Sequence, residues 1–210
     1  TSEWNSIKAY DSLRQVSQIP SEVIEKMSTV TLLRTVLKYP LLTDVLVYDS
    51  YQQGIEHLAK NFSAFPVLIN RKDLDVSLLK IYGEYANKNL VSYSGYQKGE
   101  HSFQTSFLEL LINQLFQKKN NDITYHQAYL QQILQFYKIK REDPETFGRL
   151  GLSTGVWAMN RILLADKSSE SYAIKDDIID KGTIFQESII EKLVQQTETF
   201  LSDIKSRTNN

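Results

Sequence analysis

Residues 19–82 decide the fold, because they hold the densest run of apolar residues and helix punctuation in the chain: IPSEVIEKMSTVTLLRTVLKYPLLTDVLVYDSYQQGIEHLAKNFSAFPVLINRKDLDVSLLKIY. Ser28 is well suited to cap a helix that begins at Thr29. Ser50 and Gln53 have the spacing of a capping box, in which the side chain of each residue bonds to the backbone of the other. Short helices joined by two or three residues must turn back on one another, so this stretch predicts stacked antiparallel helical hairpins.

Residues 41–48 carry the apolar residues of a possible strand within this stretch. We reject the strand, because no partner of alternating pattern lies nearby and a single strand leaves its backbone hydrogen bonds unmade.

The remaining chain extends this helical pattern. Residues 83–99 hold three of the eight glycines and predict the longest loop, and residues 100–205 predict longer helices. Further helix starts are expected at Asp143-Pro144 and at two more capping boxes, Thr124 with Gln127 and Thr183 with Gln186. We therefore predict a single all-α domain over residues 1–210, with about ten short and medium helices, an order compatible with a solenoid-like superhelix.

Composition excludes several classes of function. The 24 basic and 25 acidic residues give a net charge of -1, so no overall field attracts nucleic acid or an anionic membrane. The absence of cysteine excludes disulfides, thiolate metal sites and cysteine nucleophiles. No apolar run approaches the roughly 18 residues of a transmembrane helix. The sequence predicts neither a cofactor nor a nucleic-acid partner.

The first part of the chain resembles a group of uncharacterised bacterial proteins that usually follow a secretory or lipoprotein signal. The matching residues are Ile19-Pro20, Met27-Ser28-Thr29, Leu32-Leu33, Tyr39-Pro40-Leu41, Asp44, Gly54, Asn61-Phe62, Arg71-Lys72-Asp73 and Leu78-Leu79. The resemblance implies an extracytoplasmic helical protein, secreted or attached to the cell surface. Any lipid-anchor cysteine would precede Thr1. The resemblance implies no activity and no functional residues.

Two patterns that suggest catalysis have simpler explanations. Residues 151–155, GLSTG, match the nucleophile elbow of some hydrolases, but that motif needs a strand before the serine and a histidine after it in the chain. The preceding residues predict helix and the three histidines, His57, His101 and His126, all come earlier. We interpret the glycines as a turn or as close helix packing, with Ser153 as a helix cap.

The histidines also lie in separate segments without a ligand-spaced partner, so we predict no metal site and place them at the surface or the edge of the core. Glu100-His101 is expected at an exposed helix start. The sequence assigns no catalytic residue.

Candidate binding residues are the three tyrosines of the 83–99 segment, Tyr85, Tyr93 and Tyr96, together with Arg71. Tyrosine supplies a large contact area and a polar tip at low entropic cost, and arginine can grip a carboxylate in a fork. Arg71 has a simpler explanation as a charge that complements a helix dipole. The favoured function is an interaction module that binds protein or glycan, and the alternative is a hydrolase with a dispersed active site.

Overall fold

The computed structural model describes residues 10–117, 125–165, 167–174 and 187–208. Within these ranges it contains ten α-helices, two short 3-10 helices and no strand, so the prediction of an all-α protein is confirmed. The chain forms two compact units, Thr1–Ser77 (unit 1) and Leu78–Asn210 (unit 2). The boundary between the units falls inside the 19–82 stretch, whose last five residues belong to unit 2.

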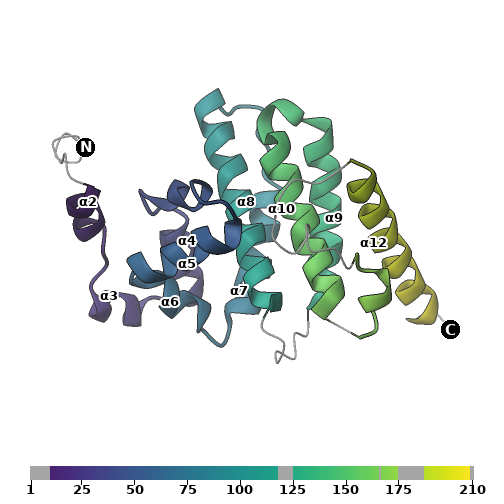
Figure 1. The fold of residues 1–210 in the computed structure, drawn as a ribbon, viewed down its shortest axis with the longest axis horizontal. Helices are drawn as coiled ribbons and strands as arrows, with labels where there is room; N and C mark the ends of the chain where they lie inside the picture. The colour runs from purple at the N-terminus through teal and green to yellow at the C-terminus, as the bar shows by residue number, and fades with distance from the viewer. Residues whose placement is uncertain (1–9, 118–124, 166, 175–186, 209–210) are drawn as a thin grey trace. The chain divides into compact units, whose positions relative to one another are not determined.

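Unit 1 is built from short helices (Figure 1). They are α2 (Tyr10–Val16), α3 (Ser21–Lys26), α4 (Thr29–Val36), the 3-10 helix η1 (Leu42–Leu46), α5 (Tyr51–Asn61), α6 (Ala64–Ile69) and the start of α7 (Leu74–Ala86). Residues 41–48 form no strand, as expected from their lack of a partner strand, and contain the 3-10 helix η1 instead.

Ser28 and Ser50 cap helices of unit 1 as predicted, Ser50 through one half of the expected capping box. Ser28 Oγ accepts the backbone N–H of Thr31 at 3.2 Å, and Ser50 Oγ accepts that of Gln53 at 3.3 Å. The apolar faces of α4, α5 and α6 make the core, where Leu32, Phe65 and Leu68 have no exposed surface. Local capping therefore explains where these helices begin, and apolar periodicity explains which faces they bury.

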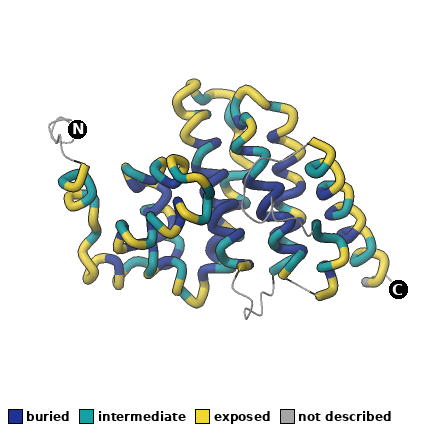
Figure 2. Tube along the Cα trace, viewed as in Figure 1, coloured by how far each residue is buried: buried dark blue, intermediate teal, exposed yellow. Residues whose placement is uncertain are grey.

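Unit 2 contains the long helices. They are α8 (Gly95–Gln117), α9 (His126–Glu142), α10 (Pro144–Ala165) and α12 (Glu187–Thr208), with the 3-10 helix η2 (Glu170–Tyr172) between the last two. α8 packs against α10, α10 packs against α9, and α12 covers α9 and α10. Buried residues are numerous along both α8 and α10 (Figure 2), and α10, which contacts α8, α9 and α12, is the central helix of this unit.

The helix starts of unit 2 agree with the sequence in part. Asp143 Oδ1 accepts the N–H of Thr146 at 3.1 Å, as expected of an N-cap before Pro144. Gly148 then adopts a positive φ of 54° and kinks α10, a backbone conformation that favours glycine. Thr124 and Thr183 lie outside the described residues.

The loop predicted at residues 83–99 is shorter than expected. α7 continues through Ala86 and α8 begins at Gly95, which leaves residues 87–94 as the connecting segment. The cause is a capping box that the sequence contains: Ser94 N–H donates to Gln97 Oε1 at 2.9 Å, and Gln97 N–H donates to Ser94 Oγ at 3.3 Å. Gly83 and Gly99 therefore lie inside helices.

Candidate functional site

The three candidate tyrosines have different environments. Tyr85, near the end of α7, and Tyr93, in the connecting segment, are half-buried and both lie against His101. Tyr96, in the first turn of α8, is 83% exposed, and Val91 of the connecting segment is 89% exposed. Val91, Tyr93 and Tyr96 thus lie within six residues of chain, the first and last exposed and Tyr93 half-buried, and we call these three residues the contact surface.

His101 lies beneath the contact surface and is only 3% exposed, so the predicted placement at an exposed helix start is wrong. It lies two turns into α8, a helix that is buried on most sides. Its ring stacks on Tyr85 with an interplanar angle of 8° and a centroid distance of 5.6 Å. The edges of Tyr93 and Phe147 close the other sides, each 6.4 Å away between centroids.

The imidazole is held in its neutral form. Burial first, and then the positive charges of Lys88 and Lys140, lower the pKa of His101 to about 4. Its Nε2 is buried and makes no hydrogen bond. A histidine this inaccessible does not reach a substrate in this conformation, so here it packs as an aromatic ring and does not act as a catalytic acid or base.

A second group of titratable side chains lies wholly inside unit 2. Lys140 Nζ on α9 donates to both carboxylate oxygens of Glu109 on α8, at 2.7 and 2.8 Å, and to the Gly151 carbonyl of α10 at 2.7 Å. Tyr82 of α7 and Thr154 of α10 donate their hydroxyls to the same carboxylate, at 2.7 and 2.6 Å. We call these five groups the Glu109–Lys140 network.

Desolvation dominates this network. The side chains of Glu109 and Lys140 are fully buried. Burial lowers the pKa of Lys140 and raises that of Tyr82, while Glu109 opposes the first shift and adds to the second. With its polar atoms paired and no exposed surface, the network joins four helices and offers nothing to a ligand.

The GLSTG sequence supplies two members of this network, the Gly151 carbonyl and the Thr154 hydroxyl, and does not form a nucleophile elbow. Residues 151–155 lie inside α10, without a preceding strand. Ser153 lies in the middle of α10, where its Oγ donates to the Leu150 carbonyl, so it is not the predicted helix cap. A Cβ at Gly155 would lie 3.1 Å from Glu109 Oε1, which means that the glycine leaves room for the carboxylate. Close helix packing is therefore the reason for this glycine.

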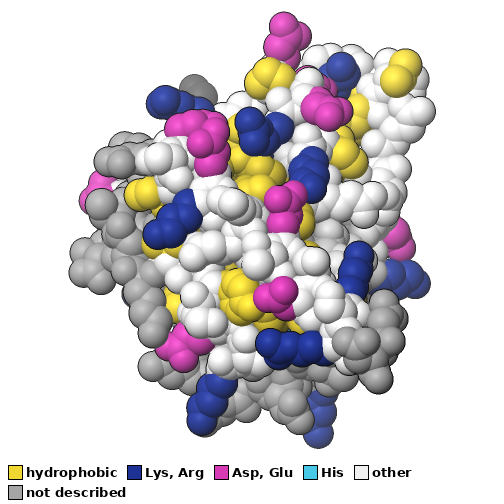
Figure 3. Space-filling view, turned by 90° about the vertical axis from the view of Figure 1, so that its right-hand side faces the viewer, with side chains coloured by type: hydrophobic (Ala, Val, Ile, Leu, Met, Phe, Trp, Pro, Cys, Tyr) yellow, Lys and Arg dark blue, Asp and Glu magenta, His cyan; other side chains and the backbone are white. Residues whose placement is uncertain are grey.

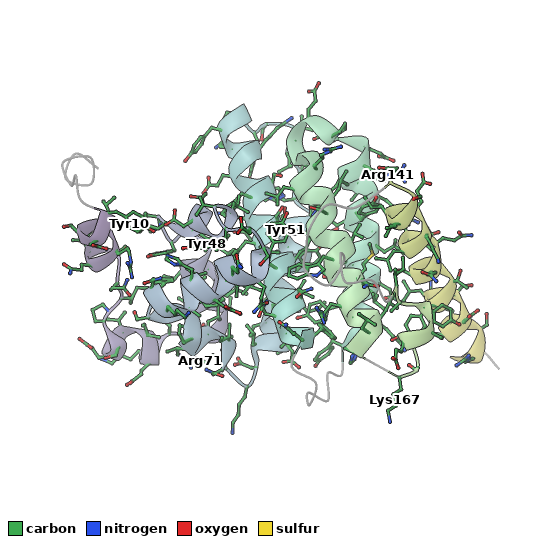
Figure 4. The ribbon with its side chains drawn as sticks, in the orientation of Figure 1. Tyr10, Tyr48, Tyr51, Arg71, Arg141 and Lys167 are labelled. Atoms are coloured by element: carbon green, nitrogen blue, oxygen red, sulfur yellow. The ribbon has the colours of Figure 1, made fainter. Side chains whose placement is uncertain are left out.

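Arg71 belongs to unit 1 (Figure 4), where its guanidinium already hydrogen-bonds to backbone carbonyls. Its Nη2 donates to the carbonyls of Ile24 and Met27, at 3.0 and 3.2 Å, where α3 ends. The guanidinium therefore neutralises the C-terminal carbonyls of a helix that is distant in sequence. The dipole interpretation accounts for Arg71 without a ligand.

We expect the change Arg71→Met to lower the free energy of unfolding of unit 1 by roughly 1–3 kcal/mol, because two buried carbonyls lose a charged donor. Urea unfolding followed by circular dichroism measures this effect. Lys72→Met is the matched control, since Lys72 is exposed and next in the chain. Equal stability of the two variants would contradict the capping role.

Unit 1 also has a polar groove of about 480 Å³ between α2 and the end of α5. Asp11, Arg14 and Lys60 are among its lining residues, and Asp11 is paired with Arg14 at 3.4 Å. Gln18, also in the lining, bonds to the backbone of Asn61 and Ser63. The Gln18 bonds attach the chain that follows α2 to the end of α5, and the lining residues include no histidine.

The outer face of unit 2 around α12 carries mixed charges (Figure 3). Basic and acidic side chains are interspersed on this face. Lys138 of α9 and Glu198 of α12 form an ion pair whose charged atoms lie 2.5 Å apart. Such a face has no single-sign field to attract a polyanion.

Two negative findings concern the described ranges only. No helix within them combines the length and the apolar character that a membrane crossing requires. No group of three or more histidine, aspartate or glutamate side chains is arranged there to hold a metal ion.

Comparison with known proteins provides no relative from which residues could be transferred. No family model matches this chain, and neither a curated protein nor a solved structure matches it. The site must therefore be interpreted from its own geometry.

Proposed function

We propose that this protein is an interaction module that binds a protein partner through the contact surface of Val91, Tyr93 and Tyr96. The supporting observation is the exposure of Val91 and Tyr96, at 89% and 83%, on one short stretch of chain. Large exposed apolar side chains gathered in one place mark interaction sites more often than scattered ones do.

The buried chemistry favours binding over hydrolysis. The strongly perturbed groups in unit 2, His101, Tyr82 and Lys140, are at most 3% exposed. A hydrolase needs such groups in a cleft open to substrate. A protein is the preferred ligand because an exposed valine beside tyrosine offers apolar contact area, whereas a glycan site needs more hydrogen-bonding groups.

The expected result of mutagenesis is a loss of affinity without a loss of stability. Tyr96→Ala and Val91→Ser should each weaken partner binding about tenfold or more, the usual effect of removing an interface anchor. Their melting temperatures should stay within about 2 °C of the parent, because both side chains are in solvent. The partner is first isolated by affinity capture, and its dissociation constant is then measured with purified proteins.

Val47→Ser is the matched control, since Val47 is a 76% exposed valine on unit 1. Equal binding by Val47→Ser, Val91→Ser and Tyr96→Ala would refute the proposed surface. If the parent bound a glycan on an array and no protein, and Val91→Ser and Tyr96→Ala lost that binding, the surface would stand and the ligand would be a glycan.

We also propose that the protein works outside the cytoplasm, as the resemblance of residues 19–82 implies. Fractionation of cells that express the native gene tests this location. Recovery of the protein only in the cytoplasmic fraction would reject it.

A further inference from the structure

His101 connects the contact surface to the interior of unit 2. Tyr85 of α7, Tyr93 of the connecting segment and Phe147 of α10 surround its ring. The charged groups that act on it are Lys88, beside the connecting segment's tyrosine, and Lys140 of α9. Both are cations, and the carboxylate of Glu109 is already bound to Lys140.

The connecting segment itself is held weakly. Residues 87, 88, 89, 91, 92 and 94 are exposed, and the hydrogen bonds in the middle of the segment are those of Val91 N–H to Asn89 Oδ1 and Tyr93 N–H to the Leu90 carbonyl. Its two ends are attached to the neighbouring helices by Lys88 N–H, which donates to the Tyr85 carbonyl, and by Ser94 N–H, which donates to Gln97 Oε1. Lys88 Nζ lies 5.3 Å from the centre of the Tyr93 ring, within the range of a cation–π contact. The contact of Tyr93 with His101 fastens this segment to α8.

We propose that His101 is a lock that fastens residues 87–94 onto unit 2 when neutral and releases them when it takes up a proton. A protonated imidazole between Lys88 and Lys140, in an aromatic pocket without a hydrogen-bond acceptor for Nε2, is unfavourable, so proton uptake favours displacement of the segment. Because Val91 and Tyr93 belong to the segment, acid would dismantle the contact surface. The proposal rests on the proposed function for its biological meaning but not for its test.

The direction of the effect follows from linkage. The closed state holds the pKa of His101 at about 4, and an opened segment exposes the ring to water, where histidine titrates near 6.5. Between these values only the opened state binds the proton, so opening becomes more favourable as the pH falls. The opening equilibrium should rise about tenfold per pH unit between about pH 6 and pH 4.5, by roughly 160-fold at pH 4, and level off near 300-fold at lower pH.

Hydrogen exchange of single amides measures this equilibrium without any partner. The reporters are the amides of Lys88 and Ser94, whose acceptors, the Tyr85 carbonyl and Gln97 Oε1, lie outside the segment. They are followed at pH 6.5, 5.5 and 4.5 and corrected for the intrinsic exchange rate. Tyr129 N–H, which donates to the Tyr125 carbonyl at 2.9 Å in α9, is the reference for opening of the whole unit. The lock predicts that the reporters lose protection in acid while Tyr129 keeps it.

The control variant is His101→Phe, which keeps an aromatic ring against Tyr85 and cannot titrate. Its opening equilibrium should be flat over the same pH range. Lys88→Met should raise the pH at which the dependence levels off, because one repelling charge is gone. A parent and a His101→Phe variant with the same pH dependence would overturn the lock, as would parallel loss of protection at Tyr129. Failure of the contact surface in binding assays would leave these exchange results unaffected.

Discussion

Lys140→Met is expected to lower the free energy of unfolding by about 3–5 kcal/mol, because it leaves the Glu109 carboxylate fully buried without its cation. Glu109→Gln should also lower the free energy of unfolding, because it leaves the Lys140 ammonium buried without a counter-charge. Chemical denaturation of each variant at pH 7 measures the loss.

The double variant Glu109→Gln with Lys140→Met separates charge from packing. It removes both charges and keeps an amide whose oxygen can accept one of the two hydroxyls, from Tyr82 or Thr154, while its NH2 group donates to the other hydroxyl oxygen. We expect it to be clearly more stable than the sum of the single losses, with a coupling of a few kcal/mol.

Lys138→Met provides the matched control on the same helix. Lys138 pairs with Glu198 but its side chain is 56% exposed, so the variant should lose no more than about 1 kcal/mol. If Lys140→Met were as harmless as Lys138→Met, the Glu109–Lys140 network would not be closed to water as described.

Gly54→Ala is the second substitution with a large expected effect, about 3 kcal/mol of lost stability. A Cβ at this position of α5 would lie 2.1 Å from the carbonyl oxygen of Val45 and 2.8 Å from its Cα and carbonyl carbon. Backbone atoms cannot rotate away as a side chain does, so η1 and α5 would have to separate. Thermal melting of the purified variant measures the loss.

Gly99→Ala is its control, because Gly99 lies inside α8 with nothing within 4 Å of the added carbon. Alanine favours a helix over glycine by up to about 1 kcal/mol, so this variant should be as stable as the parent or slightly more stable. If Gly54→Ala had the same melting temperature as Gly99→Ala, η1 would not contact α5 closely.

The sequence by itself determined the helical class and several helix starts. Ser28, Ser50 and Asp143 each cap the helix that follows, as their spacing predicts. These signals are readable because each acts within three residues, so neighbouring chain segments do not alter them. The Ser94–Gln97 capping box carried the same signal, but the glycines and asparagines around it favoured a loop, and the connecting segment was predicted too long.

Only the tertiary structure decided the roles of the charged and aromatic residues. Glu109 and Lys140 are 31 residues apart, and nothing near either one distinguishes it from a surface charge until α8, α9 and α10 pack together. His101 likewise becomes buried because α7, α10 and the connecting segment close around it. Burial is a property of the whole packed unit, since it depends on which helices cover a position, and it is burial that changes the chemistry of these groups.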